Sequence, residues 1–258
     1  MNFVRQHTTI PVPTVWLTLH LGVTNWIVMT RVRGSCLDTK TWEALSKMAQ
    51  DHIIAQLRSY IDQLRAIPPP SSPAICSVSG GAVRDFRLCM VPHGPYADEG
   101  EMNAQARGGS ERSDEEWCRM QGLPSSVSDS HSKRHRLVFT HGDIRMRNIM
   151  VQGDKVTGLI DWECAGWFPA HWEYLKANFC IEHSCDWQKR LPEFIPSYTL
   201  ELEADRALRR VYWSAALPPY IPARKDIVSL QDLSFHDSLL TLAYLPVRLA
   251  FGLFFTTN

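Results

Sequence analysis

Three oxygen-bearing side chains, Asp143, Asn148 and Asp161, lie within one short segment of the chain. Carboxylate and amide oxygens are ligands that Mg²⁺ prefers, and Mg²⁺ usually keeps further positions for water or phosphate oxygens. Asp143 follows the apolar run 137–139, so we expect it in a loop at the end of a strand. If the three side chains meet, they can hold a magnesium ion and leave room for phosphate oxygens.

The elements that must bring these side chains together form a predicted β-hairpin. Two apolar, β-branched runs, 149–152 and 156–160, flank a Gly-Asp pair at 153–154, which is typical of a tight turn. With the turn centred near this pair, Asn148 and Asp161 fall nearly opposite each other at the open end. Opposed residues on paired strands have Cβ atoms about 5 Å apart. The hairpin therefore delivers two oxygen ligands to one place.

These residues also carry a family resemblance. The pattern His141-x-Asp143-x-x-x-x-Asn148, followed by Asp161-Trp-Glu, resembles the catalytic and metal-binding segments of the protein-kinase-like superfamily, in the form found in aminoglycoside phosphotransferases and choline kinases. The resemblance implies an α+β fold with a partial small lobe and a mostly helical large lobe. It implies Asp143 as catalytic base, Asn148 and Asp161 as Mg²⁺ ligands, and His141 as a structural residue that hydrogen-bonds the loop backbone. The alternative is that His141, Asp143 and Asp161 are ordinary turn residues.

Further charged residues border this segment. Arg145 and Arg147 could meet phosphate oxygens, because a guanidinium suits bidentate phosphate contact; the alternative is a solvated face of the loop. Met146 stands where many relatives carry proline, which reduces loop stiffness but removes no chemical group. Glu163 and Glu173 are candidate carboxylates on the acceptor side if the substrate is cationic. We count Arg147 with the catalytic residues.

The N-terminal part, 1–33, resembles the end of a kinase-like small lobe. A short helix is expected first, followed by strands at 15–21 and 26–30. The string Thr-x-Ile-Pro-Val-Pro at 8–13 resembles fungal members of the phosphotransferase group. By that resemblance, the backbone of the following hinge would face the adenine of ATP, at Met29, Thr30 and Arg31.

The sequence lacks two features that relatives carry before this string. It contains no G-x-G-x-x-G or G-x-x-x-x-G-K motif, and Lys40, its first lysine, follows the hinge. The leading hypothesis is transfer of the γ-phosphoryl of Mg-ATP to a hydroxyl of a small molecule. The competing hypothesis is a catalytically silent binding module. A third is an N-terminally truncated product whose small lobe is encoded upstream.

The predicted large lobe spans 34–215 and contains a long irregular insert at 70–136. A helical stripe of apolar residues runs through 53–64 and predicts a core helix. Within the insert, 98–106 and 114–121 suggest short helices, while we expect much of 108–133 to be disordered.

After the hairpin, 165–169 predicts a turn and 201–212 a closing helix. The aromatic residues Trp162, Trp167 and Trp172 either stack on a substrate or pack in the core. Beyond them lies a divergent tail, 216–258.

Composition favours a cytoplasmic protein. The 258 residues carry 27 Lys+Arg and 27 Asp+Glu, so no overall field recruits nucleic acid or an anionic membrane. The seven cysteines are odd in number and show no C-x-x-C pair, which favours reduced thiols, and no signal peptide is expected.

Cys180, His183 and Cys185 suggest buried thiols at a helix end rather than zinc. The apolar run 239–255 contains Pro246 and Arg248, which favours a core helix over a membrane anchor.

Overall fold

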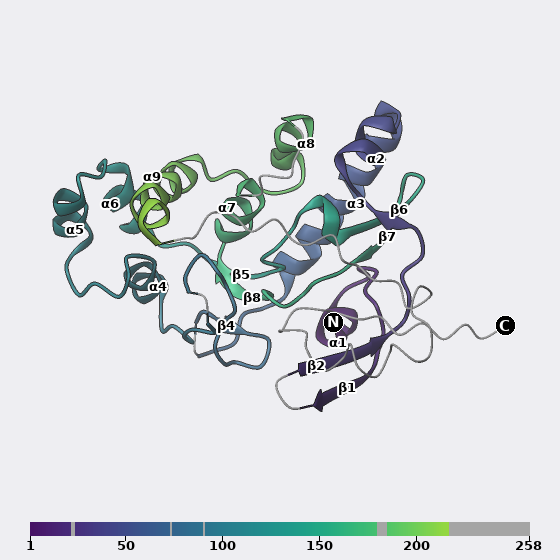
Figure 1. The fold of residues 1–258 in the computed structure, drawn as a ribbon, viewed down its shortest axis with the longest axis horizontal. Coiled ribbons are helices and arrows are strands. Elements are labelled where there is room, and N and C mark those ends of the chain that lie inside the picture. The colour runs from purple at the N-terminus through teal and green to yellow at the C-terminus, as the bar shows by residue number, and fades with distance from the viewer. Residues whose placement is uncertain (22–23, 73, 90, 180–184, 217–258) are drawn as a thin grey trace, which may run out of the picture.

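The computed structural model describes residues 1–21, 24–72, 74–89, 91–179 and 185–216 (Figure 1). The predicted N-terminal elements are present. Helix α1 (Asn2–His7) is followed by β1 (Val15–Leu21) and β2 (Thr24–Met29), which pair antiparallel. The chain then runs through β3 (Ser35–Cys36) toward the helices of the larger part.

The predicted catalytic hairpin is formed by β6 (Ile149–Gln152) and β7 (Lys155–Leu159). Gln152 pairs with Lys155, so the turn consists of the expected Gly-Asp pair. A bulge near Met150 shifts the register, and Ile149 pairs with Leu159. The backbone of Asn148 consequently faces Ile160, with a hydrogen bond of 3.0 Å, and Asp161 follows one residue later.

Strand β3 pairs with β6 and extends the hairpin to a three-stranded sheet, and a second three-stranded antiparallel sheet leads into the catalytic loop. Its order is β4 (Cys76–Ser77), β8 (Gly166–Pro169) and β5 (Leu137–Thr140). The predicted turn at 165–169 is therefore wrong, because most of this segment is strand β8. All four β8 residues are buried, so the segment reads as an apolar run without the alternation that marks a half-buried strand.

Buried side chains of the helices pack against these sheets and form the hydrophobic core with them. Asp38 and Ser46 cap α2 (Thr39–Ala44) and α3 (Lys47–Ala66) through side-chain hydrogen bonds to backbone N–H groups. The predicted apolar stripe of α3 is buried and contacts β5 and β7. The later helices are α7 (Trp172–Asn178), α8 (Cys185–Arg190) and α9 (Thr199–Ala216), with 3₁₀ turns at Met146–Asn148 and Leu191–Glu193.

The insert is more ordered than the sequence predicts. It forms α4 (Glu99–Ala106), α5 (Asp114–Gln121) and α6 (Ser126–His131), of which the first two were expected. The expected disorder across 108–133 is wrong because α6 packs on α9 and α5 packs on α6, as Figure 1 shows at one end of the molecule. Their shared core is small, and its partners are separated widely in sequence: Trp117, Cys118, Val127, Ala204 and Leu208.

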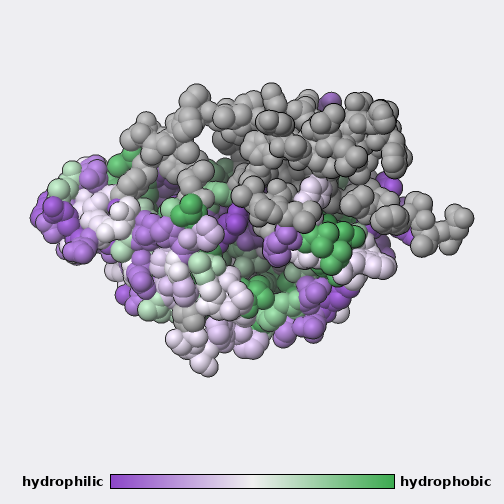
Figure 2. Space-filling model, turned by 60° about the horizontal axis from the view of Figure 1, so that its bottom comes forward, coloured by the Kyte–Doolittle hydropathy of each residue, from purple (hydrophilic) through white to green (hydrophobic). Residues whose placement is uncertain are grey.

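The surface mixes residue types. Hydrophobic patches lie among hydrophilic ones on the face drawn in Figure 2. Large hydrophobic side chains also project to solvent from β1, where Trp16 is 72% exposed. Within the described ranges, no helix has the length and apolar character needed to cross a membrane. Some predicted features lie outside the described residues: the run 239–255, most of the tail, and Cys180 with His183.

Candidate active site

The loop after β5 makes a sharp bend that only glycine fits. Gly142 has φ +77, and a Cβ atom there would lie 2.6 Å from the backbone oxygen of Cys164. A side chain at this position would need both a disfavoured backbone conformation and a shift of the neighbouring chain. The bend places His141 and Asp143 on either side of Gly142, directly before the hairpin.

His141 holds the loop against the hairpin. Its side chain is fully buried. Its Nε2 lies 3.1 Å from the carbonyl oxygen of Ile160, and its Nδ1 lies 3.2 Å from the backbone nitrogen of Asp143. Burial lowers the pKa of His141 to about 4, so the ring is neutral near pH 7. A neutral ring with the proton on Nε2 donates to Ile160 and accepts from Asp143, which fits both contacts.

Glu173 holds the same loop from the buried side, through hydrogen bonds to its backbone. Only 3% of this residue is exposed. Its carboxylate accepts hydrogen bonds from the backbone N–H groups of His141 at 2.7 Å and Gly142 at 3.1 Å. Burial raises the pKa of Glu173 to about 7, although these hydrogen bonds act in the opposite direction. Glu173 therefore points into the protein, and its expected position on the acceptor side is wrong.

Asp143 and Asn148 are brought together by the loop and the 3₁₀ turn. The Asn148 amide Nδ2 donates to Asp143 Oδ2 at 2.8 Å and to the Asp143 backbone oxygen at 2.9 Å. Arg145 contacts the other carboxylate oxygen of Asp143. Because the amide nitrogen of Asn148 is used on Asp143, the carbonyl oxygen of the same side chain is the atom suited to a metal ion.

Asp161 has an unusual backbone. Its φ of +65 makes it the one non-glycine residue with a positive φ in the described part of the chain. Asp tolerates this region better than most residues, but such positions are uncommon and cluster at functional sites. The pKa of its carboxyl is raised by partial burial first and then by the negative charges of Glu163 and Asp143. Arg147 and Arg145 oppose this shift.

The hinge residues lie where β2 ends, beside the hairpin. Met29 pairs with Val15, and the Thr30 backbone N–H donates to Thr14 at 2.9 Å. The linker that follows Arg31 then packs on β7: the Thr157 hydroxyl donates to the backbone oxygen of Arg33 at 2.6 Å. Met29, Thr30 and Arg31 are thus close in the fold to the hairpin that carries Asn148. Arg147 is exposed on the 3₁₀ turn.

The tryptophans after the hairpin serve packing. Trp167 and Trp172 are buried, and the Trp172 indole donates to Asp85 at 2.8 Å. Trp162 is half-buried, and its ring centroid lies 4.3 Å from that of His141. Trp167 and Trp172 therefore pack in the core and do not form a platform for a substrate. Trp162 packs against the ring of His141.

Comparisons with known proteins bear on the family and the fold of the chain. A sequence model described as APH, the phosphotransferase enzyme family, matches residues 1–191. No curated protein sequence matches the chain. The GDP complex of aminoglycoside 2'-phosphotransferase-IIIa shares the fold, with a TM-score of 0.50 and 12% identity over 81% of this chain and 70% of that one.

Two other solved structures score slightly lower. An aminoglycoside phosphotransferase APH(4)-Ia bound to ADP and hygromycin B has a TM-score of 0.49, 14% identity and coverage of 83% and 75%. An aminoglycoside-3'-phosphotransferase of type VIII has a TM-score of 0.46, 19% identity and coverage of 79% and 75%. The family match confirms the resemblance seen in the histidine–aspartate–asparagine pattern, and the shared fold agrees with the α+β kinase-like prediction.

Proposed function

Because the chain belongs to the phosphotransferase enzyme family, we propose that it transfers the γ-phosphoryl group of Mg-ATP to a hydroxyl of a small molecule. The observation that carries the proposal is the Asp143–Asn148 pair, in which one amide fixes a carboxylate at 2.8 Å. Phosphoryl transfer depends mainly on positioning and charge stabilisation, so a fixed carboxylate beside a metal ligand is the arrangement it needs.

Asp143 is the proposed catalytic base. Its carboxylate is held by Asn148 and Arg145. The loop that carries it is held by the hydrogen bond from the backbone N–H of His141 to Glu173. A carboxylate within hydrogen-bond reach of a substrate hydroxyl can orient it and accept its proton. His141 is proposed as a positioning residue, because it contacts the loop and the hairpin.

Asn148 and Asp161 are the proposed ligands of Mg²⁺. The residues fit this ion: both offer oxygen, and the pKa of Asp161 is raised by partial burial first and then by neighbouring carboxylates, whose repulsion a cation would relieve. Bound there, the ion would neutralise charge on the phosphates. The exposed Arg147 is proposed to contact a phosphate oxygen.

The nucleotide is proposed to lie between the hinge and the hairpin. The backbone at Met29, Thr30 and Arg31 would face the adenine, and the parts 1–33, 34–215 and 216–258 would act as small-lobe remnant, catalytic lobe and tail. Two of the solved structures above contain a nucleotide: one holds ADP together with hygromycin B, and the other holds GDP. For this chain we propose a small-molecule acceptor, no nucleic-acid partner, and a cytoplasmic location.

Calorimetric titration of ATP tests the proposal, with and without Mg²⁺. We expect binding that requires Mg²⁺ and is lost in Asp161→Ala. Asp154→Ala is the matched control, because Asp154 is an exposed aspartate at the turn of the same hairpin and pairs with His52. Failure of the folded protein to bind ATP, or equal binding by Asp161→Ala, would refute this function and favour the silent binding module.

A further inference from the structure

A second polar cluster lies away from the loop that carries Asp143. It consists of Glu99 at the start of α4, His135 just before β5, and His171 just before α7. Each offers one ligand atom, and these atoms all lie within 4.8 Å of one another. Glu99 and His171 are each 5% exposed, and the His135 side chain is 12% exposed. The proposed phosphotransfer reaction uses none of the three.

Two of the separations between the three ligand atoms are close to those around a tetrahedral ion. The Glu99 Oε1 lies 2.9 Å from His135 Nδ1 and 3.6 Å from His171 Nδ1. Zinc binds imidazole nitrogen and carboxylate oxygen at about 2.0–2.2 Å, which separates neighbouring tetrahedral ligands by about 3.3–3.5 Å. The two observed separations lie on either side of that value, so small side-chain adjustments would complete the geometry.

His171 gives an independent indication of a ligand. Its buried Nδ1 has no hydrogen-bond partner among the described residues, and 3.6 Å to Glu99 is too long for a hydrogen bond. An unsatisfied buried nitrogen is costly, and a bound cation would remove the cost.

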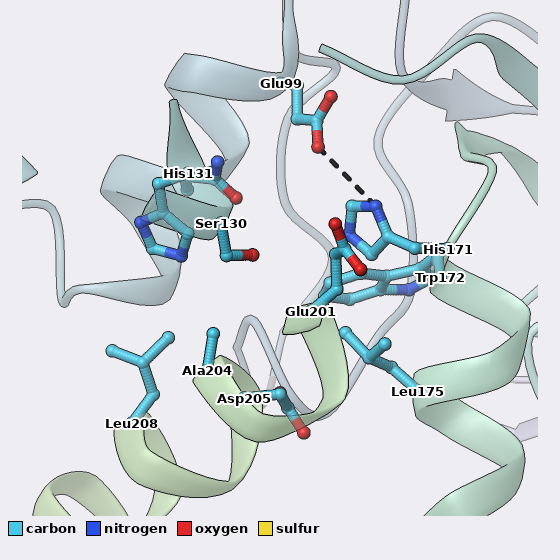
Figure 3. A pocket seen from close by; sticks show the side chains of 11 residues that line it. Glu99, Ser130, His131, His171, Trp172, Leu175, Glu201, Ala204, Asp205 and Leu208 are labelled. Atoms are coloured by element: carbon cyan, nitrogen blue, oxygen red, sulfur yellow. Dashed lines mark ion pairs between the residues drawn. The ribbon is translucent and has the colours of Figure 1, made fainter. Parts of the chain in front are cut away.

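The surroundings orient the other two ligands. The backbone N–H of His135 donates to Glu99 Oε2 at 2.9 Å, while Oε1 makes a hydrogen bond of 2.9 Å with His135 Nδ1 that an ion between the two atoms would replace. The second nitrogen of His135 lies 3.3 Å from Glu201 Oε1, and Lys133 lies 3.3 Å from the same oxygen. A carboxylate on the far nitrogen of a ligating histidine is a common outer-shell partner in zinc sites. Figure 3 shows Glu201 projecting from α9 beside His171.

A small cavity adjoins the cluster. It has a volume of about 30 Å³. Polar side chains, among them Ser130, His131 and Glu201, line it together with apolar side chains of α7 and α9 (Figure 3). A cavity of this size with polar groups in its wall can hold one water molecule. Such a water is suited to the fourth position of an ion held by three protein ligands.

We propose that Glu99, His135 and His171 bind one divalent transition-metal ion of the zinc type, with a cavity water as fourth ligand. The ion joins the insert helix α4 to the start of β5 and the start of α7, and Glu201 adds α9 through the outer shell. It therefore fastens the insert to the segments that lead into the catalytic loop. The role is structural and does not depend on the proposed phosphotransfer.

Cobalt titration of the chelator-treated full chain tests this site. We expect one Co²⁺ per chain, with intense visible absorption typical of a tetrahedral ion and without a thiolate charge-transfer band. His171→Phe should weaken Co²⁺ binding at least about 100-fold, and Glu201→Gln about 10- to 100-fold. The control is His52→Phe, because His52 is an exposed histidine that pairs with Asp154 away from the cluster.

Stability provides a second readout that does not require activity. Saturating Zn²⁺ should raise the Tm of the unmodified chain and of His52→Phe but not that of His171→Phe. Metal-free His171→Phe should still fold, because it replaces an unsatisfied nitrogen with carbon; if it does not, Glu99→Gln serves as the ligand variant. The proposal is wrong if folded protein binds no stoichiometric Co²⁺, or if binding is unchanged in the ligand variants or shows thiolate bands.

Discussion

Glu173→Gln separates the charge of a buried carboxylate from its shape. Burial raises the Glu173 pKa from its usual 4.5 to about 7. Between about pH 4.5 and pH 7 the folded chain therefore keeps a proton on Glu173 that the unfolded chain has lost. The contribution of this carboxyl to the free energy of unfolding is complete below about pH 4.5 and is lost as pH rises through about 7. The difference of about 2.5 pKa units corresponds to about 3 kcal/mol over this window. Glutamine does not titrate, so the variant lacks this slope.

The variant also loses hydrogen bonding. Both oxygens of Glu173 face backbone N–H donors of His141 and Gly142, whereas glutamine presents one oxygen and one NH₂ group. The protonated carboxyl present near pH 5 can still accept through its hydroxyl oxygen, whereas the NH₂ group cannot, so the variant leaves one donor unmatched, which costs about 1–3 kcal/mol. We therefore expect Glu173→Gln to be less stable than the unmodified chain near pH 5. The difference should then shift by about 3 kcal/mol in favour of the variant by about pH 8.

Urea unfolding followed by tryptophan fluorescence measures this difference at several pH values. Glu203→Gln is the control for the loss of a glutamate side chain, because Glu203 is exposed on α9. The reasoning fails if the stability difference between the unmodified chain and Glu173→Gln is constant from about pH 5 to about pH 8. A constant difference would mean that Glu173 titrates alike in the folded and unfolded chain.

Two further substitutions address the loop and the proposed reaction. Gly142→Ala should destabilise the chain by about 1–3 kcal/mol in thermal unfolding, because it combines positive φ with a Cβ 2.6 Å from Cys164. Gly153→Ala shares the positive φ but meets nothing within 4 Å, so an equal loss would contradict the steric explanation. Asp143→Asn should lower kcat by about 10²–10⁴-fold in a phosphotransfer assay and leave Mg-ATP binding intact. Full activity in that variant would exclude Asp143 as the base.

Local sequence patterns predicted the elements whose determinants are close together in the chain. The hairpin follows from two β-branched runs and a Gly-Asp turn, and α4 and α5 match 98–106 and 114–121. The order of 108–133 was not predictable, because α5 and α6 are stabilised by α9, far along the sequence. A polar composition that looks disordered alone folds once a distant helix covers its few apolar residues.

The supporting residues of the site were missed for the same reason. Glu173 was expected to face a substrate, since a carboxylate on a helix with aromatic neighbours carries no mark of where it points. Its hydrogen-bond partners are 31 and 32 residues away. The ligand cluster is similarly scattered over Glu99, His135 and His171, with no spacing that resembles a metal motif.

Helix α7 brings these separate features into one structural unit. His171 precedes it and faces the Glu99 cluster, Glu173 in its first turn holds the catalytic loop, and Lys176 binds the buried Asp85 at 3.0 Å. The three side chains contact different segments of the chain, so a displacement of α7 would disturb all of them together. An ion on His171 would hold one end of α7 two residues from Glu173. Metal removal is therefore expected to loosen the His141–Gly142 backbone, and hydrogen exchange at those two amides should rise in the chelated protein but stay the same in His171→Phe on addition of chelator.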